Sequence, residues 1–296
     1  MKIIITIVLI TLMILTGTSY ALTGLRLLAV EQGARPVGMG GAFSAVDKDP
    51  YSMAYNPAAT YGLQGLHGSA GHNTHWKNVS IETGYLAFTK KDITFSTGIQ
   101  FAGFGKLEGR GDIPTSDFIE FEAHDISVKF GVSFELEKNV YMGLAAGYMY
   151  EKIDIYRGSA INFDLGLLFT PRPDMNISAA LQNIGKRMNL RDESFKLPST
   201  GRVGASYRHN HLLAAIDIVA VDDDVDDGYD LRTHLGGEYQ ITPEFSARAG
   251  YRLGYESKSF SAGFGFTKRN FRIDYAFLPY SNENDDSHLI NLTFSH

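Results

Sequence analysis

A run of five aspartates within seven residues is the feature of this sequence that most resembles a metal site. The run extends from Asp222 to Gly228, and carboxylate oxygens at this spacing could bind Ca²⁺. Its glycine comes one position late for an EF-hand loop, and no Glu stands at the position that closes such a loop. We therefore interpret the run as a solvent-exposed loop and predict no metal site.

Motifs for catalysis and for cofactor binding are missing from the sequence. It contains no GxSxG or HExxH motif and no Cys, which excludes a Cys-ligated zinc site. His209 and His211 flank a predicted turn, and no third ligand stands nearby in the sequence. Gly38-Met39-Gly40 begins like a dinucleotide-binding loop, but Phe43 occupies the position of the third glycine. We predict no catalytic residue and no cofactor, and we do not expect an enzyme.

Three arginines near the C-terminus could bind an anionic ligand. Arg248, Arg252 and Arg272 stand on the polar face of alternating segments, and a guanidinium can hold a carboxylate with two hydrogen bonds. Other charged residues are predicted on the same face: Glu82, Lys129, Asp164, Asp217, Arg232, Glu238 and Asp274. The mixed signs also suit a structural network of ion pairs, so both interpretations stay open. We expect the apolar side chains of Leu86 and Phe88 on this face as well.

The stretch from Gly33 to Ala59 reads GARPVGMGGAFSAVDKDPYSMAYNPAA and lacks any alternation of apolar and polar residues. Gly38, Gly40 and Gly41 permit a positive φ or a close backbone approach. Pro57 disfavours a helical conformation at Asn56, whose side chain can cap or bridge backbone groups. These residues either pack a plug or take a direct part in gating.

This stretch resembles the N-terminal signature of the PorV/PorQ family, which belongs with the FadL-type long-chain fatty-acid transporters. Those proteins share an Asn-Pro-Ala element, here Asn56-Pro57-Ala58, in an N-terminal hatch. The resemblance implies a fourteen-stranded β-barrel with a hatch in its lumen. The hatch residues that it implies are Gly33, Ala34, Arg35, Gly38, Met39, Gly40, Gly41, Asp49, Asn56, Pro57 and Ala58.

The resemblance also implies a function. A PorV/PorQ-type barrel would serve protein secretion of the type IX kind at the cell surface, with secretion-machinery proteins or secreted substrates as partners. The alternative is a FadL-like passive transporter of hydrophobic small molecules across the outer membrane. We rank secretion first from the motif alone and keep transport as the alternative.

The elements that must position these residues are β-strands. Between His124 and Glu135, Ile126, Val128 and Phe130 alternate with Ser127 and Lys129. Such a period of two is typical of a strand with one apolar and one polar face. About fourteen segments of this kind follow from Leu66 onward, most of them long enough to cross a bilayer when tilted. We predict an all-β fold, a transmembrane antiparallel barrel.

Short and long connections alternate between these segments. Lys90-Lys91 and Lys268-Arg269 are examples of the short ones, whereas 104–122, 184–200 and 279–286 are long and could contact a secretion partner. Outer-membrane barrels have short periplasmic turns and longer extracellular loops. The alternation therefore predicts a barrel with both ends in the periplasm.

The N-terminus predicts export. Lys2 precedes an apolar stretch from Ile3 to Leu15, and Ser19-Tyr20-Ala21 offers a cleavage site. We expect a signal peptide over 1–21, a hatch segment over 22–63 and a barrel over 64–296 in the bacterial outer membrane. The lipid of that membrane is the expected partner, and the net charge of −6 argues against nucleic acid.

Overall fold

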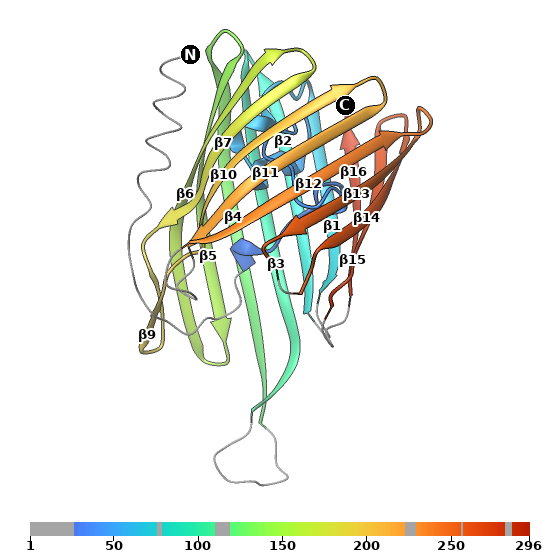
Figure 1. Cartoon of the computed structure of the whole chain (residues 1–296). Helices are drawn as coiled ribbons and strands as arrows, with labels where there is room; N and C mark the ends of the chain where they lie inside the picture. The colour runs from blue at the N-terminus through green and yellow to red at the C-terminus, as the bar shows by residue number, and fades with distance from the viewer. Residues whose placement is uncertain (1–26, 76–78, 110–118, 223–228, 256, 282–285) are drawn as a thin grey trace.

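Antiparallel strands form a closed barrel in the computed structural model (Figure 1). The structure describes residues 27–75, 79–109, 119–222, 229–255, 257–281 and 286–296. Strands that follow each other in the chain are hydrogen-bonded neighbours, except that β7 pairs with β10 across an inserted hairpin, and β1 pairs with β16 to close the barrel. The predicted signal peptide, residues 22–26 and most of the acidic run lie outside the described residues.

The barrel has fourteen strands, as the sequence predicts. They are β1 (Leu66–His75), β2 (Val79–Lys90), β3 (Ile93–Gly109), β4 (Ile119–Glu137), β5 (Val140–Ile153), β6 (Tyr156–Arg172), β7 (Met175–Gly185), β10 (Ser199–His209), β11 (Leu212–Asp222), β12 (Asp230–Gln240), β13 (Phe245–Leu253), β14 (Phe260–Lys268), β15 (Phe271–Leu278) and β16 (Ser287–Ser295). The inserted hairpin of β8 (Met188–Leu190) and β9 (Glu193–Phe195) falls in a link that we expected to lack strands.

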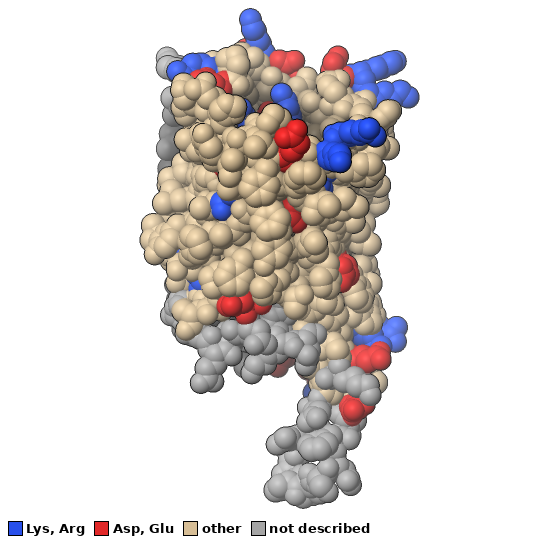
Figure 2. All heavy atoms as spheres, turned by 90° about the vertical axis from the view of Figure 1, so that its right-hand side faces the viewer, with Lys and Arg blue, Asp and Glu red and all other residues tan. Residues whose placement is uncertain are grey.

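The alternation along each strand separates an apolar exterior from a polar interior. Phe130 and Phe163 point outward and are 66% and 56% exposed, whereas Lys129 and Asp164 point into the lumen. Figure 2 shows that uncharged side chains cover the middle of the wall, while Lys and Arg gather toward the rim at which the short turns lie. Closing the barrel leaves no strand edge, so the backbone N–H and C=O groups of the strands are hydrogen-bonded to neighbouring strands. The apolar exterior suits contact with the lipid of a bilayer.

On β2 the predicted facing was wrong. Glu82, Leu86 and Phe88 are exposed on the outer surface, and Ile81 and Tyr85 point inward. Both faces of this strand carry large apolar side chains, because its inner face packs against the part of the chain that lies inside the barrel. Hydrophobicity alone therefore could not assign the phase of β2.

The two ends of the barrel meet at one rim. The Leu66 backbone N–H donates to the His296 carbonyl at 3.2 Å, and the His296 N–H donates to the Leu66 carbonyl at 2.9 Å. Residues with positive φ at the tight turns of this rim include Asp92, Asn139 and Asn210. Such turns favour short polar residues that tolerate a left-handed backbone.

The helical elements precede the barrel and lie inside it. They are the 3-10 helices η1 (Leu27–Ala29), η2 (Pro50–Ala54) and η3 (Pro57–Thr60) and the short α2 (Ala34–Gly38). Figure 1 shows this stretch in blue within the circle of strands, and we call Leu27–Leu63 the N-terminal segment. No helix in the described part of the chain is both long enough and apolar enough to span a membrane.

Candidate functional site

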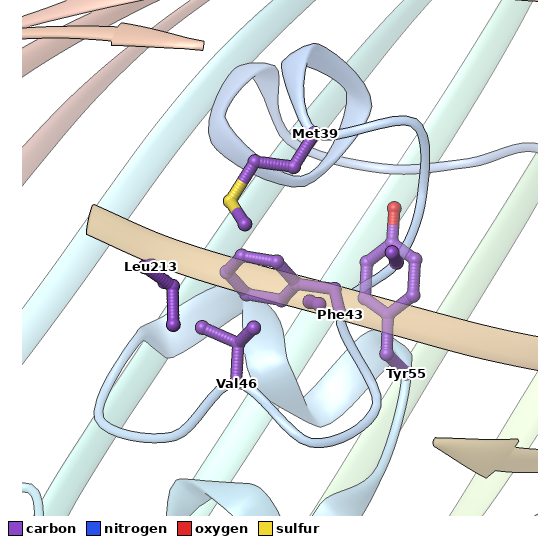
Figure 3. Packing of buried hydrophobic residues seen from close by; sticks show 7 residues of the cluster. Met39, Phe43, Val46, Tyr55 and Leu213 are labelled. Carbon is purple, nitrogen blue, oxygen red and sulfur yellow. The ribbon is translucent and has the colours of Figure 1, made fainter. Parts of the chain in front are cut away.

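The N-terminal segment fills the lumen and packs against the inner wall. Met39, Phe43 and Val46 are completely buried and contact Leu213 of β11, as Figure 3 shows. Phe43 also meets Tyr55 of the same segment edge-on, with ring centroids 5.6 Å apart. At the opposite end of the segment, Leu27 belongs to a second apolar cluster that includes lumen residues of β2, β3 and β5. The wall therefore surrounds the segment along its length.

Glycines in the motif allow the segment to touch the wall backbone. Gly40 has φ +67°, and a Cβ placed on Gly250 of β13 would collide with the Gly40 backbone nitrogen. A Cβ on Gly38 would lie 3.4 Å from the Cα of Gly263 in β14. Facing glycines thus bring the backbone at the end of α2 and just after it into contact with the wall, and a side chain on Gly250 would prevent the approach of Gly40.

Two side chains of the motif cap short helices. Asp49 Oδ1 accepts a hydrogen bond from the Tyr51 N–H at the start of η2, and Asn56 Oδ1 accepts one from the Ala58 N–H at the start of η3. Asn56 Nδ2 also donates to the carbonyls of Ser44 and Leu167, each at 3.0 Å. Because Leu167 belongs to β6, Asn56 ties two parts of the segment to the wall.

Six charged residues form a closed ring between the segment and the wall. Their order around the ring is Arg35, Asp49, Arg272, Asp274, Arg248 and Glu238. The Arg35 guanidinium binds Asp49 at 3.0 Å and Glu238 at 2.7 Å. Cations and anions alternate, so the ring is neutral, and each charge has two partners. Such pairing offsets the large cost of removing charges from water.

The ring shifts the ionisation of its members in the segment. Burial alone would raise the pKa of Asp49, but Arg272 and Arg35 lower this pKa to about 2. Burial alone would lower the pKa of Arg35, but Glu238 and Asp49 raise it well above its ordinary value. Both groups are therefore charged at neutral pH. The ring borders a cavity of about 160 Å³ that is also lined by Arg208 and His211, beside the turn between β10 and β11. The ring of charges therefore lies across the lumen near the rim of the short turns.

A second ionic contact anchors the segment further from this rim. Glu31 accepts hydrogen bonds from Arg252, whose Nη2 lies 2.6 Å from Oε2, and Lys258 lies 3.9 Å from Oε1. Burial would raise the pKa of Glu31, but Arg252 and Lys258 hold this pKa far below its ordinary range. Arg252 Nη2 also donates to the Val37 carbonyl at 3.1 Å. No local pattern in the sequence marked Glu31, because its partners, Arg252 of β13 and Lys258 of the link to β14, lie more than two hundred residues away.

The three arginines expected as ligand anchors are already bound to carboxylates. Arg248 contacts Glu238 and Asp274, Arg272 contacts Asp49 and Asp274, and Arg252 contacts Glu31. The arrangement is the network of ion pairs that we left open as the alternative. A ligand could use these arginines only after the pairs separate, so anchoring stays a prediction.

A small polar cavity of about 40 Å³ lies between the segment and the wall. Gln32, Tyr85, Gln100, Lys129 and Arg202 are among its lining residues. Gln100 Nε2 and Arg202 Nη1 have no hydrogen-bond partner within the described chain, although Arg202 Nη1 lies 3.7 Å from Asp217 Oδ2. The cavity is large enough to hold water, and it interrupts the apolar contacts along the lumen.

Asp125 of β4 and Glu151 of β5 are an exception to the charge pairing. They are register partners and both are buried, but the described residues include no basic partner for either. No group of three or more potential metal ligands occurs in the described ranges. Among the described residues, the two carboxyl groups thus lie buried side by side without a basic group in contact.

Comparison of the sequence with known proteins gives no match to a family model and none to a curated protein. Comparison of the structure does give matches. The toluene transporter TbuX of Ralstonia pickettii superposes with a TM-score of 0.67 at 16% identity, over 89% of this chain and 98% of TbuX. A FadL homologue of Pseudomonas aeruginosa gives 0.64 at 11% identity, over 92% of this chain and all (100%) of that one. The monoaromatic hydrocarbon channel CymD gives 0.63 at 14% identity, over 92% and 99%.

The fold is that of the FadL-type outer-membrane barrels. Together with the closed fourteen-strand barrel and its apolar exterior, this places the chain in the bacterial outer membrane. The matched proteins are transporters and channels, not enzymes. None of the three is a PorV or PorQ protein by its description, so that finer assignment remains a resemblance of the motif.

Proposed function

We propose that this protein is a FadL-type channel that passes small hydrophobic molecules across the outer membrane, with the N-terminal segment as its hatch. The observation that carries the proposal is the position of the segment. It fills the lumen of a closed barrel and is held there by ion pairs, caps and glycine contacts that non-covalent rearrangement can break. Passage then requires the hatch to shift.

The comparisons support transport better than secretion, which reverses the ranking that we drew from the motif. The matched structures are called a toluene transporter and a monoaromatic hydrocarbon channel. Two buried apolar clusters join the segment to the wall, one around Leu27 and Met149 and one around Met39 and Phe43, and a shift of the hatch would expose them to an apolar molecule. No observation on the described residues favours a secretion partner.

A reversible staple between hatch and wall tests this proposal. Ser44 Oγ of the hatch lies 2.8 Å from Ser178 Oγ of β7, and the protein has no native Cys. The S44C/S178C double variant should therefore form a disulfide that holds the hatch in place. Uptake of the hydrophobic dye phenylnaphthylamine is measured in intact Gram-negative cells. We expect the wild type to accelerate uptake over empty cells, the oxidised staple to abolish the acceleration, and a reductant to restore it.

The matched control staples two neighbouring wall strands to each other, and it removes one hydrogen bond to the hatch, from the Thr89 hydroxyl to the Leu63 carbonyl, in both redox states alike. Thr89 of β2 and Thr94 of β3 have their Oγ1 atoms 2.8 Å apart, so the T89C/T94C variant should conduct equally in both redox states. Wild-type uptake no faster than that of empty cells would reject a hydrophobic channel. Uptake that is unchanged by the oxidised S44C/S178C staple would reject the hatch as its gate.

A further inference from the structure

An ionisable pair stands on the outer surface of the barrel, where lipid is the expected neighbour. His72 of β1 and Glu82 of β2 are register partners, and His72 Nδ1 lies 2.6 Å from Glu82 Oε1. Both side chains are about half exposed, at 48% and 49%. Their neighbours on the flanking strands are Ile290 and Phe101, which are large, exposed and apolar. Ionisable side chains among apolar neighbours are less favourable against lipid than against another polar surface, at a cost that grows with depth in the bilayer.

A groove of about 630 Å³ runs beside this pair. The floor of the groove is formed by small residues, Ala70, Gly71 and Gly84, whereas Phe101 and Ile290 are among the larger residues that line it. Small residues flanked by large ones let a second surface approach the backbone closely, which is how membrane proteins pack against one another. The groove and the ionisable pair together form one patch across β1, β2, β3, β15 and β16.

The chemistry of the patch discriminates between occupants. The described residues that line the groove include Glu82 but neither Lys nor Arg, so an anionic lipid head group would meet a carboxylate and no fixed cation. A second copy of this chain instead brings its own His72 and Glu82. All copies have the same orientation in the membrane, so a two-fold axis along the membrane normal places like residues at the same height. Such an axis lets each His72 face the other copy's Glu82.

We propose that the protein forms a dimer in the membrane through this groove, with the two His72–Glu82 pairs exchanging partners across the interface. The interface lies on the outer wall and is independent of the lumen, so this inference goes beyond the channel function and does not depend on it.

Cysteine cross-linking in outer-membrane vesicles tests the dimer. Because the protein has no native Cys, a disulfide between two copies of an A70C variant can form only where their groove floors meet. Two outward alanines serve as matched controls: Ala146 of β5, which lines a larger apolar groove that extends across β1 to β7, and Ala214 of β11, far around the barrel. After mild oxidation we expect a covalent dimer with A70C and monomer with A146C and A214C. No dimer with A70C, or equal amounts with all three variants, would overturn the proposal.

Charge variants in the A70C background test the exchange of partners. H72E brings four carboxylates together across the interface and should abolish the A70C dimer band, whereas the swap H72E/E82H restores complementarity and should recover it. Heat-dependent gel mobility checks that each barrel is folded. If either charge variant fails to fold, an A70W variant, whose indole fills the groove, replaces both. The wild type should sediment as a dimer in detergent, and A70W should sediment as a monomer. A dimer band that survives H72E, or an A70W variant that sediments as a dimer, would contradict the proposed interface.

Discussion

Single residues in this lumen are stabilised by charges that lie far away in the sequence. Arg35 and Asp49 belong to the N-terminal segment, but their partners Glu238 and Arg272 stand on β12 and β15. Each buried charge is tolerable only because a partner of opposite sign faces it. Removing one member therefore leaves a net charge buried in the ring and takes one of the two partners from each neighbour, which costs more than a single exposed pair contributes.

The ring makes the stability of the protein depend on pH through Asp49. Its pKa in the folded state is about 2, below the ordinary value of 3.8, so its contribution is complete above pH 3.8 and is lost as the pH falls toward 2. We expect D49N to destabilise the protein by about 3 kcal/mol at neutral pH. The difference from wild type should shrink below pH 3.8.

Thermal unfolding in detergent between pH 7 and pH 2 measures this difference. The control is D92N, which changes an exposed carboxylate at the turn between β2 and β3 and should leave the melting temperature unchanged. A D49N deficit that is constant across this pH range would show that Asp49 acts through packing and not through its charge.

At the scale of elements, the strands could be predicted because burial alternates along them and the sequence alternates with it. The phase of β2 could not, since Tyr85 packs inward on Tyr51 of the segment while Leu86 faces outward. The segment itself was recognisable by its glycines and by Asn56-Pro57, but its contacts were not. Glu31 and Glu238 acquire Arg252 and Arg35 as partners only when the segment packs inside the barrel, and no local spacing encodes that packing.

The contact between α2 and β13 depends on glycine at both surfaces. A methyl group at Gly250 would collide with the backbone of Gly40, so we expect G250A to displace α2 at a cost of about 1–3 kcal/mol while the barrel still folds. A cysteine placed at Val37 of α2, which is buried in the wild type, should then react with a maleimide in the G250A protein. The control is G237A on β12, where a Cβ meets nothing within 4 Å. Equal protection of V37C from the maleimide in both variants would contradict the close contact.

For the whole molecule, the two rims differ in the length of their connections and in what closes them. The rim of the short turns holds both ends of the barrel and lies next to the ring of charges. The other rim carries the β8–β9 hairpin, and Leu27 of the segment packs in that half of the lumen near Val79 and Phe104. Ion pairs thus lie in both halves of the lumen, but the closed ring of six charges lies next to the rim of the short turns.

The direction of the barrel in the membrane follows from these rims. Short turns are periplasmic in outer-membrane barrels, so the ring of charges should close the periplasmic side and the hairpin should face the medium. Asp192, whose side chain is 94% exposed between β8 and β9, and Lys138, in the turn between β4 and β5, mark the two rims. With no native Cys to interfere, a membrane-impermeant maleimide should label D192C in intact cells. It should label K138C only after the outer membrane is permeabilised, and the reverse pattern would place the ring of charges on the outside.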